Sequence, residues 1–161
     1  TQLMPDLSNQ DPILDEIIGK LIVTDYCTTE EFQRVRKILQ RYPARINIGR
    51  IDLGVLKQFL HANEDFLVRM LENPALLEHE YFTSLLQGVF HLAEELEKRP
   101  DLADLPETDL AHLTGDIERV YHALINEWLD YMQHLKKHYP YLFSLAMRTN
   151  PFDDSASPII R

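Results

Sequence analysis

Hydrophobic residues recur at a spacing of three and four positions in two long segments, residues 75–98 and 108–138. Residues at this spacing share one face of a helix, so both segments are predicted to be amphipathic helices. The loop "RPDLADLPET" between them contains two prolines, which favours an antiparallel hairpin with the two apolar stripes facing each other. The stripes are Phe82, Leu85, Val89, Leu92 and Leu96 in the first helix and Leu110, Leu113, Ile117, Val120, Leu124, Trp128, Tyr131 and Leu135 in the second.

Shorter apolar patterns predict further helices before this hairpin, at 13–23, 28–42, 53–60 and 64–72. Thr28 and Glu31 are three positions apart at the start of the second of these, which is the spacing of a capping box. Asp52 and Asn63 precede the last two helices, where a short polar side chain can act as the N-cap. Residues 46–53 alternate briefly between apolar and polar, so an extended segment is expected there.

The chain ends in the stretch "YPYLFSLAMRTNPFDD", residues 139–154, which contains a short apolar run. This run is about half the length that a membrane span requires. We therefore expect a short helix after Pro140 that folds back on the end of the bundle, with Leu142, Leu145 and Ala146 on one face and Phe143 and Met147 on a neighbouring one. Arg148 would lie near its C-terminus, where a cation suits the helix dipole.

These patterns together predict an all-α helical bundle of six or seven helices, built on the hairpin 75–98/108–138. We expect residues 1–152 to form a single domain in which 1–12 is an N-terminal arm, and residues 153–161 to be a disordered tail. The chain starts at Thr1, and we expect it to be part of a longer protein.

The net charge of −10 and a pI of about 5.1 argue against nucleic acid as a partner. Within the acidic chain, residues 32–51 carry six basic residues and no acidic one, whereas residues 94–118 are strongly acidic. Three interpretations of the basic run are open: a solvated helix face, a contact with the acidic region 94–118 of the same chain or of a neighbouring one, or a contact with anionic lipid. The residues proposed for such a contact are Arg34, Lys37, Arg41 and Arg45.

Candidate chemistry is sparse. The single cysteine, Cys27, excludes an internal disulfide, and the serines lie in no nucleophile pattern. We expect no catalytic residue and no cofactor. Seven histidines raise the alternative of a metal site, because His91 and Glu95, His112 and Asp116, and His134 and His138 are each four positions apart.

The residues considered as candidate metal ligands are His91, Glu95, His134 and His138. The preferred interpretation is that they are surface residues making local pairs. His91 and Glu95 lie on the flank of the apolar stripe, and Lys136 and Lys137, beside His134 and His138, would repel a cation.

Residues 70–99 and 116–152 resemble the soluble C-terminal region of a prokaryotic family of ion-channel-like proteins with a two-transmembrane, potassium-channel-type pore. The quoted segments are "MLENPALLEHEYFTSLLQGVFHLAEELEKR" and "DIERVYHALINEWLDYMQHLKKHYPYLFSLAMRTNPF". The resemblance implies a helical domain at the cytoplasmic face of a membrane, attached to a membrane-embedded channel part of the same protein. It also implies homo-oligomeric contacts through helix faces.

The function expected from the sequence is therefore a non-enzymatic cytosolic regulatory or assembly domain of an ion-channel-like membrane protein. Two alternatives stay open: a metal-binding helical-bundle protein or enzyme, and a free-standing soluble adaptor. Stoichiometric iron or zinc in protein purified without chelator would favour the first of these alternatives.

Overall fold

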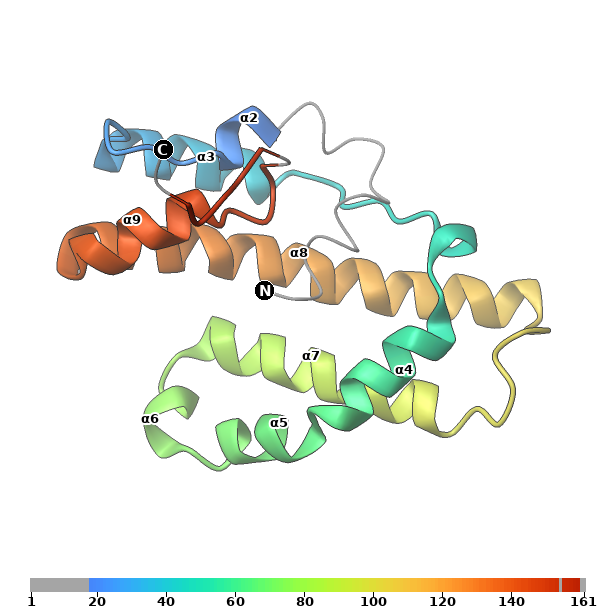
Figure 1. Ribbon diagram of the computed structural model, residues 1–161. Helices are drawn as coiled ribbons and strands as arrows, with labels where there is room; N and C mark the ends of the chain where they lie inside the picture. Colours follow the sequence, from blue (N-terminus) through green and yellow to red (C-terminus); the bar gives the residue numbers. More distant parts are fainter. Residues whose placement is uncertain (1–17, 154, 160–161) are drawn as a thin grey trace. The chain divides into compact units, whose positions relative to one another are not determined.

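A computed structural model of the chain describes residues 18–153 and 155–159, and every regular element among them is helical (Figure 1). The prediction of an all-α helical bundle is confirmed. The expected arm 1–12 and the first residues of the expected helix 13–23 lie outside the described residues. The chain divides into two compact units, residues 46–123 and the remainder, so the prediction of one domain over 1–152 stays a prediction.

The first unit combines the N-terminal helices with the C-terminal part of the chain (Figure 1). It contains α2 (Ile18–Leu21), α3 (Thr29–Leu39), the second part of α8 (Glu107–His138) and α9 (Pro140–Arg148). Helix α3 begins with the predicted capping box. The Thr28 hydroxyl accepts a hydrogen bond from the Glu31 backbone, and the Glu31 carboxylate accepts one from the Thr28 backbone at 2.6 Å.

Helix α3 is attached to α8 by polar contacts at its exposed side. The guanidinium of Arg36 pairs with Asp130 and donates a hydrogen bond of 3.0 Å to Gln133. On the same part of α8, the Lys136 ammonium donates to the backbone carbonyls of Thr24, Asp25 and Cys27 at 3.3, 2.6 and 2.6 Å. These carbonyls belong to the segment that enters α3, so Lys136 fixes the start of that helix.

The C-terminal segment is a helix, as expected, and it packs through one of its two apolar faces. Phe143 of α9 is buried, whereas Leu142 and Leu145 are 52% and 45% exposed, so the face that contains Phe143 is the packed one. The reason is that Phe143 occupies the inward position and lies beneath the Lys136 ammonium, 5.5 Å from the ring centre. Arg148 is in the last turn, where its charge was expected.

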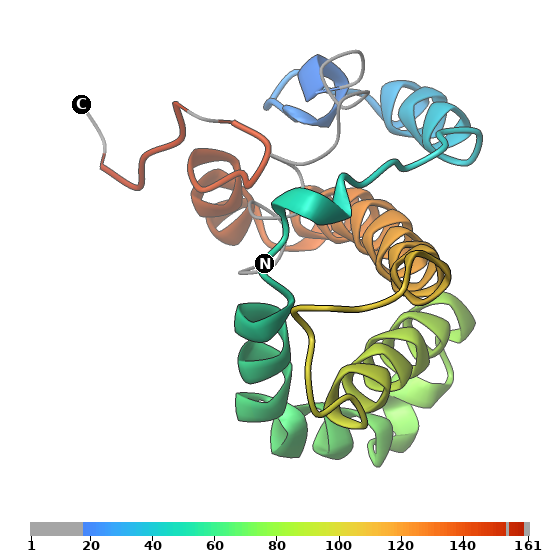
Figure 2. The same ribbon diagram turned by 90° about the vertical axis from the view of Figure 1, so that its right-hand side faces the viewer.

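The second unit contains the shorter central elements, α7 and the first part of α8, up to residue 123 (Figures 1 and 2). Its elements before α8 are η2 (Ile48–Arg50), α4 (Leu53–Ala62), α5 (Glu64–Leu71), α6 (Pro74–Leu77) and α7 (Glu80–Glu97). Helices α4, α5 and α6 all contact α7.

Local capping explains where several of these elements start. Residues 46–53 do not form the expected extended segment, because the Asn47 side chain caps a 3₁₀ turn by accepting from the Gly49 backbone. Asp52 caps α4 by accepting a 2.9 Å hydrogen bond from Val55. At α5 the expected capping bond is not formed, since the Asn63 amide donates backwards to the Phe59 carbonyl.

The hairpin runs antiparallel in this unit, as predicted. Leu85, Val89, Leu92 and Leu96 of α7 are buried, as are Leu113, Ile117 and Val120 of α8, while Phe82 is only partly buried. The expected helix 75–98 is divided at Glu78 and His79 into α6 and α7. Gly88 of α7 faces Val120 of α8, and a β-carbon on this glycine would lie 3.5 Å from the Val120 side chain.

No helix in the described part of the chain is both long and apolar enough to cross a membrane.

Candidate metal site

The antiparallel register of α7 and α8 brings a buried carboxylate of α8 next to two histidines. The side chain of Asp116 is only 3% exposed. One of its oxygens, Oδ1, accepts a 2.8 Å hydrogen bond from Arg119. The other, Oδ2, is buried and has no hydrogen-bond partner among the described residues. Burying a carboxylate oxygen without a hydrogen-bond partner costs free energy of folding, so a group that compensates this oxygen is expected nearby.

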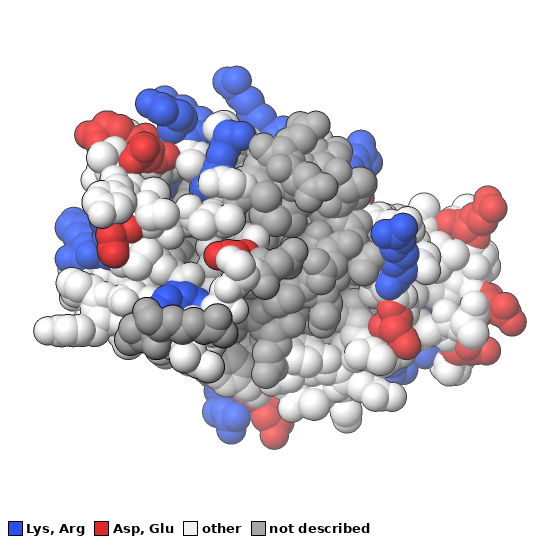
Figure 3. Space-filling view, turned by 45° about the horizontal axis from the view of Figure 1, so that its top comes forward, with Lys and Arg blue, Asp and Glu red and all other residues white. Residues whose placement is uncertain are grey.

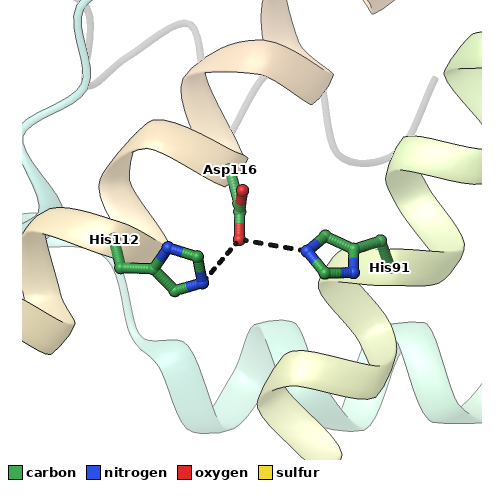
Figure 4. A group of neighbouring side chains, drawn as sticks. All are labelled: His91, His112 and Asp116. Atoms are coloured by element: carbon green, nitrogen blue, oxygen red, sulfur yellow. Dashed lines mark ion pairs between the residues drawn. The ribbon is translucent and has the colours of Figure 1, made fainter.

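Two imidazoles face this oxygen from different helices (Figure 4). The Nε2 atom of His91, on α7, lies 3.7 Å from Asp116 Oδ2, and the Nε2 atom of His112, on α8, lies 3.4 Å from it. Both distances exceed the usual range of 2.7–3.2 Å for an N–H···O hydrogen bond, so neither imidazole satisfies the oxygen. Both histidine side chains are about half exposed, which leaves the site open to solvent.

The spacing of these atoms suits a shared cation. Ligand atoms about 2.1 Å from a tetrahedral zinc ion are separated from one another by roughly 3.4 Å. The three atoms of His91, His112 and Asp116 lie within 4.8 Å of one another, and the shorter separations are 3.4 and 3.7 Å. Small rotations of the exposed imidazoles would bring the set to coordination distances. Imidazole nitrogen and carboxylate oxygen are both established zinc ligands.

A second carboxylate, Glu95 of α7, lies beside the same imidazoles. Its Oε1 is 4.0 Å from His91 Nε2, and its Oε2 is 3.7 Å from His112 Nε2. Arg99 donates a 2.7 Å hydrogen bond to Glu95 Oε2 and also contacts Asp109. The hydrogen bond from Arg99 holds the pKa of the Glu95 carboxyl below its ordinary value, despite an opposing effect of desolvation.

The structure separates the metal candidates that the sequence had grouped. His91 and Glu95 lie in the second unit beside His112 and Asp116, whereas His134 and His138 belong to the first unit. There, the rings of His134 and His138 lie 4.8 Å apart with their planes tilted by 38°, and both are near the Tyr139 ring.

Sequence reasoning recognised His112 and Asp116 as a pair but left them out of the candidate site. The missing information was the register of the hairpin, because His91 approaches this pair from the opposite helix. The signal available in the sequence was that two pairs with four-residue spacing, His91/Glu95 and His112/Asp116, flank one apolar seam.

The basic residues proposed for lipid or an acidic partner are all on the surface. Arg34, Lys37, Arg41 and Arg45 are exposed, and none of them forms an ion pair within the described part of the chain. Figure 3 shows Lys and Arg side chains at several separate places, interspersed with acidic and uncharged ones. The geometry is compatible with a solvated helix face, and the proposed contacts stay predictions.

A shallow groove of about 170 Å³ lies between α4, α5 and α7. Leu60, Leu67 and Phe90 form part of its lining, and Lys57 and Glu97 make an ion pair at its edge. None of His91, His112 and Asp116 lines this groove. The histidine cluster is therefore separate from the groove.

Comparisons with known proteins show the family to which the chain belongs. The family described as "Uncharacterized protein MJ1433, C-terminal helical domain" matches residues 1–148. The chain is 51% identical over 136 residues to "Uncharacterized protein MJ1433" of Methanocaldococcus jannaschii, which covers 84% of this chain and 55% of that protein. The chain thus spans about half the length of the curated relative that it matches. No solved structure matches the chain.

The family match corrects the resemblance to ion-channel-like proteins. Residues 70–99 and most of 116–152 fall within the matched region, and nothing in the family description or in the relative points to a channel. The assignment to a potassium-channel-type family was therefore wrong, and so was the implied role in potassium transport. The quoted segments are apolar helical stripes with acidic flanks, a pattern common to many helical domains.

Proposed function

We propose that this chain, which belongs to the family of the MJ1433 C-terminal helical domain, binds a divalent transition-metal ion through His91, His112 and Asp116. The observation that carries the proposal is the buried Oδ2 atom of Asp116. This oxygen lacks a hydrogen-bond partner among the described residues and faces two imidazole nitrogens at 3.4 and 3.7 Å. A cation bound to all three atoms would satisfy it.

The ion would act as a cross-link within the hairpin. His91 comes from α7, whereas His112 and Asp116 come from α8, four residues apart on one face. Binding to the folded hairpin but not to the unfolded chain stabilises the folded state. We therefore propose a metal-dependent structural role for this domain and no catalytic one. Zinc is the reference ion, because two imidazoles and a carboxylate suit it and it has no redox chemistry.

Protonated histidines are the competing explanation for the same geometry. An imidazolium at position 91 or 112 would form an ion pair with Asp116 and need no metal. The two explanations differ in a simple way. An ion pair requires only protons, whereas a metal site predicts saturable binding of one ion per chain at neutral pH.

The test is the metal content and zinc affinity of protein purified without chelator. We expect about one zinc, iron or related ion per chain by elemental analysis, or one zinc bound on titration of the chelator-treated protein. Asp116→Asn should abolish this binding, because a neutral amide is a poor ligand. His91→Ala should do the same. The matched control is His134→Ala, which removes an exposed histidine from α8 outside the cluster and should leave binding unchanged.

Absence of saturable zinc binding by the wild-type chain would refute the proposal and favour the ion pair. Equal loss of binding in His134→Ala would place the ion elsewhere. The roles that the sequence suggested for the longer protein, regulation or assembly and self-association, stay predictions. Sedimentation analysis of the chain with and without zinc would test self-association directly.

A further inference from the structure

We infer that Glu95 completes the metal site as its fourth protein ligand through Oε1, and that Arg99 fixes this carboxylate by holding its other oxygen. This inference rests on the proposed function. The number of protein ligands determines whether the metal site of the hairpin is open or closed. Three protein ligands would leave a coordination position for water or substrate, whereas four would close the site.

The two oxygens of Glu95 have different surroundings. Oε2 accepts the hydrogen bond of 2.7 Å from Arg99, while Oε1 faces His91 Nε2 at 4.0 Å. No hydrogen bond to Oε1 is found within the described ranges, so this oxygen is available to a cation. It does not yet belong to the three-residue group that lies within 4.8 Å, so the carboxylate must turn slightly towards the ion. The side chain is 28% exposed, which leaves room for that rotation.

Arg99 is held rigidly enough to orient Glu95. Its Nη2 and Nε atoms form a two-pronged pair with the Asp109 carboxylate at 2.6 and 2.8 Å. Its Nη1 donates to the backbone carbonyl of Glu95 at 2.5 Å as well as to Oε2. The Arg99 side chain is only 16% exposed. A planar guanidinium bound on both edges has few alternative positions, so it holds Oε2 of Glu95 in place and leaves Oε1 to turn about that oxygen towards the ion.

This arrangement follows a general feature of metal sites. Groups behind the ligands that hydrogen-bond to them orient the ligands, and their loss lowers metal affinity by roughly 10–100-fold. Arg99 and Asp109 fit this role, because Asp109 lies in the first turn of α8 and Arg99 just after the end of α7. The pair thus connects the metal site to the end of the hairpin. Asp109 positions Arg99, and Arg99 positions Glu95.

The test compares zinc affinities of three variants of the full chain. Glu95→Gln keeps the size of the side chain and an oxygen that can accept from Arg99, but it removes the anionic ligand. We expect zinc affinity to fall at least about tenfold. Arg99→Gln should weaken zinc binding by roughly 10–100-fold without removing any ligand. The matched control is Glu94→Gln, which removes the same charge from the neighbouring exposed position and should change affinity little.

Replacing zinc by cobalt gives a second measurement, the visible absorption spectrum of the bound ion. A purely structural or long-range electrostatic effect of the substitution would leave this spectrum unchanged. The visible absorption of bound cobalt depends on the number and type of its ligands. Glu95→Gln should change this spectrum, while Glu94→Gln should leave it as in the wild type. Zinc binding by the wild type with unchanged affinity and spectrum in Glu95→Gln would overturn the inference and leave the three-ligand proposal intact. Failure of the wild type to bind zinc would refute both the role of Glu95 and the proposed metal site itself.

Discussion

The amide nitrogen of Asn150 donates a 3.0 Å hydrogen bond to the backbone carbonyl of Leu21, 129 positions earlier in the chain. Both residues are buried. The amide oxygen of Asn150 also accepts a hydrogen bond from the Phe152 backbone, and the Phe152 ring packs edge-on against Trp128. Asn150 therefore joins the C-terminal segment to the N-terminal helix of the same unit.

Replacing Asn150 by alanine should destabilise the protein by about 1–3 kcal/mol, because the buried Phe152 N–H would lose its acceptor and the Leu21 carbonyl would keep only its bond from the Val23 backbone. Urea unfolding monitored by circular dichroism measures this change. The control is Gln40→Ala, which shortens an exposed polar side chain in the same unit and should stay within about 0.5 kcal/mol of the wild type. A change in Asn150→Ala no larger than that of the control would show that water replaces the lost bond.

Gly88→Ala should stabilise the hairpin despite its position between two helices. A β-carbon there would lie at an ordinary contact distance of 3.5 Å from Val120, and alanine is favoured over glycine in a helix by about 0.5–1 kcal/mol. The change is measured as a shift of the urea midpoint. Gly115→Ala is the matched control, because it lies in α8 with nothing within 4 Å of the added carbon. Stabilisation by the control alone would mean that α7 and α8 approach more closely than described.

Asp109 should make stability depend on pH in the acid range. The Arg99 guanidinium holds the pKa of the Asp109 carboxyl below its ordinary value of 3.8. A depressed pKa in the folded state means that the contribution is present above the unfolded-state pKa and is lost as pH falls through the folded-state value. Asp109→Asn should therefore be less stable than the wild type at pH 6. The difference should shrink below about pH 4.

Urea midpoints collected between pH 6 and pH 2.5 with chelator present would measure this difference without interference from metal. A difference between wild type and Asp109→Asn that stays constant over this range would contradict the prediction. It would assign the effect of the substitution to packing.

Zinc should raise the melting temperature of the wild-type chain. At a free zinc concentration 100 times the dissociation constant, binding adds about 2.7 kcal/mol to the free energy of unfolding. The shift should vanish in Asp116→Asn and persist in His134→Ala, as measured by differential scanning calorimetry. An equal shift in all three proteins would indicate non-specific binding to the acidic surface.

Local patterns predicted the helices well, because their determinants are close in sequence. The capping box of Thr28 and Glu31 and the cap at Asp52 involve residues three positions apart, and the structure confirms both. The failures occurred where the conformation depends on a cap that the apolar pattern does not reveal or on a contact between residues distant in the sequence. Residues 46–53 were expected to be extended, but the Asn47 cap and the hydrogen bond from Ile46 to Glu118 of α8 settle their conformation.

The candidate metal site also depends on a contact between residues that are distant in the sequence. Histidine and carboxylate pairs along one helix were visible in the sequence, but the meeting of His91 with Asp116 depends on the register of α7 against α8. The apolar face of α9 is a second example. Helical spacing placed Leu142 and Leu145 on one face and Phe143 on a neighbouring one, and Phe143 is the buried residue, because α9 packs beside the Lys136 side chain. The sequence pattern of a nine-residue helix does not specify which side faces the core.

The capture of the Lys136 ammonium by three backbone carbonyls has a consequence for chemical reactivity. An amine attacks an acylating reagent through its lone pair, so it must first lose a proton and leave its hydrogen-bond acceptors. In Lys136, loss of a proton would break at least one of the bonds to Thr24, Asp25 and Cys27. The neighbouring Lys137 is exposed, and its ammonium forms no such hydrogen bonds with the residues that the structure describes. Brief treatment of the folded chain with an amine-reactive ester should modify Lys137 first and leave Lys136 unlabelled until the segment before α3 opens.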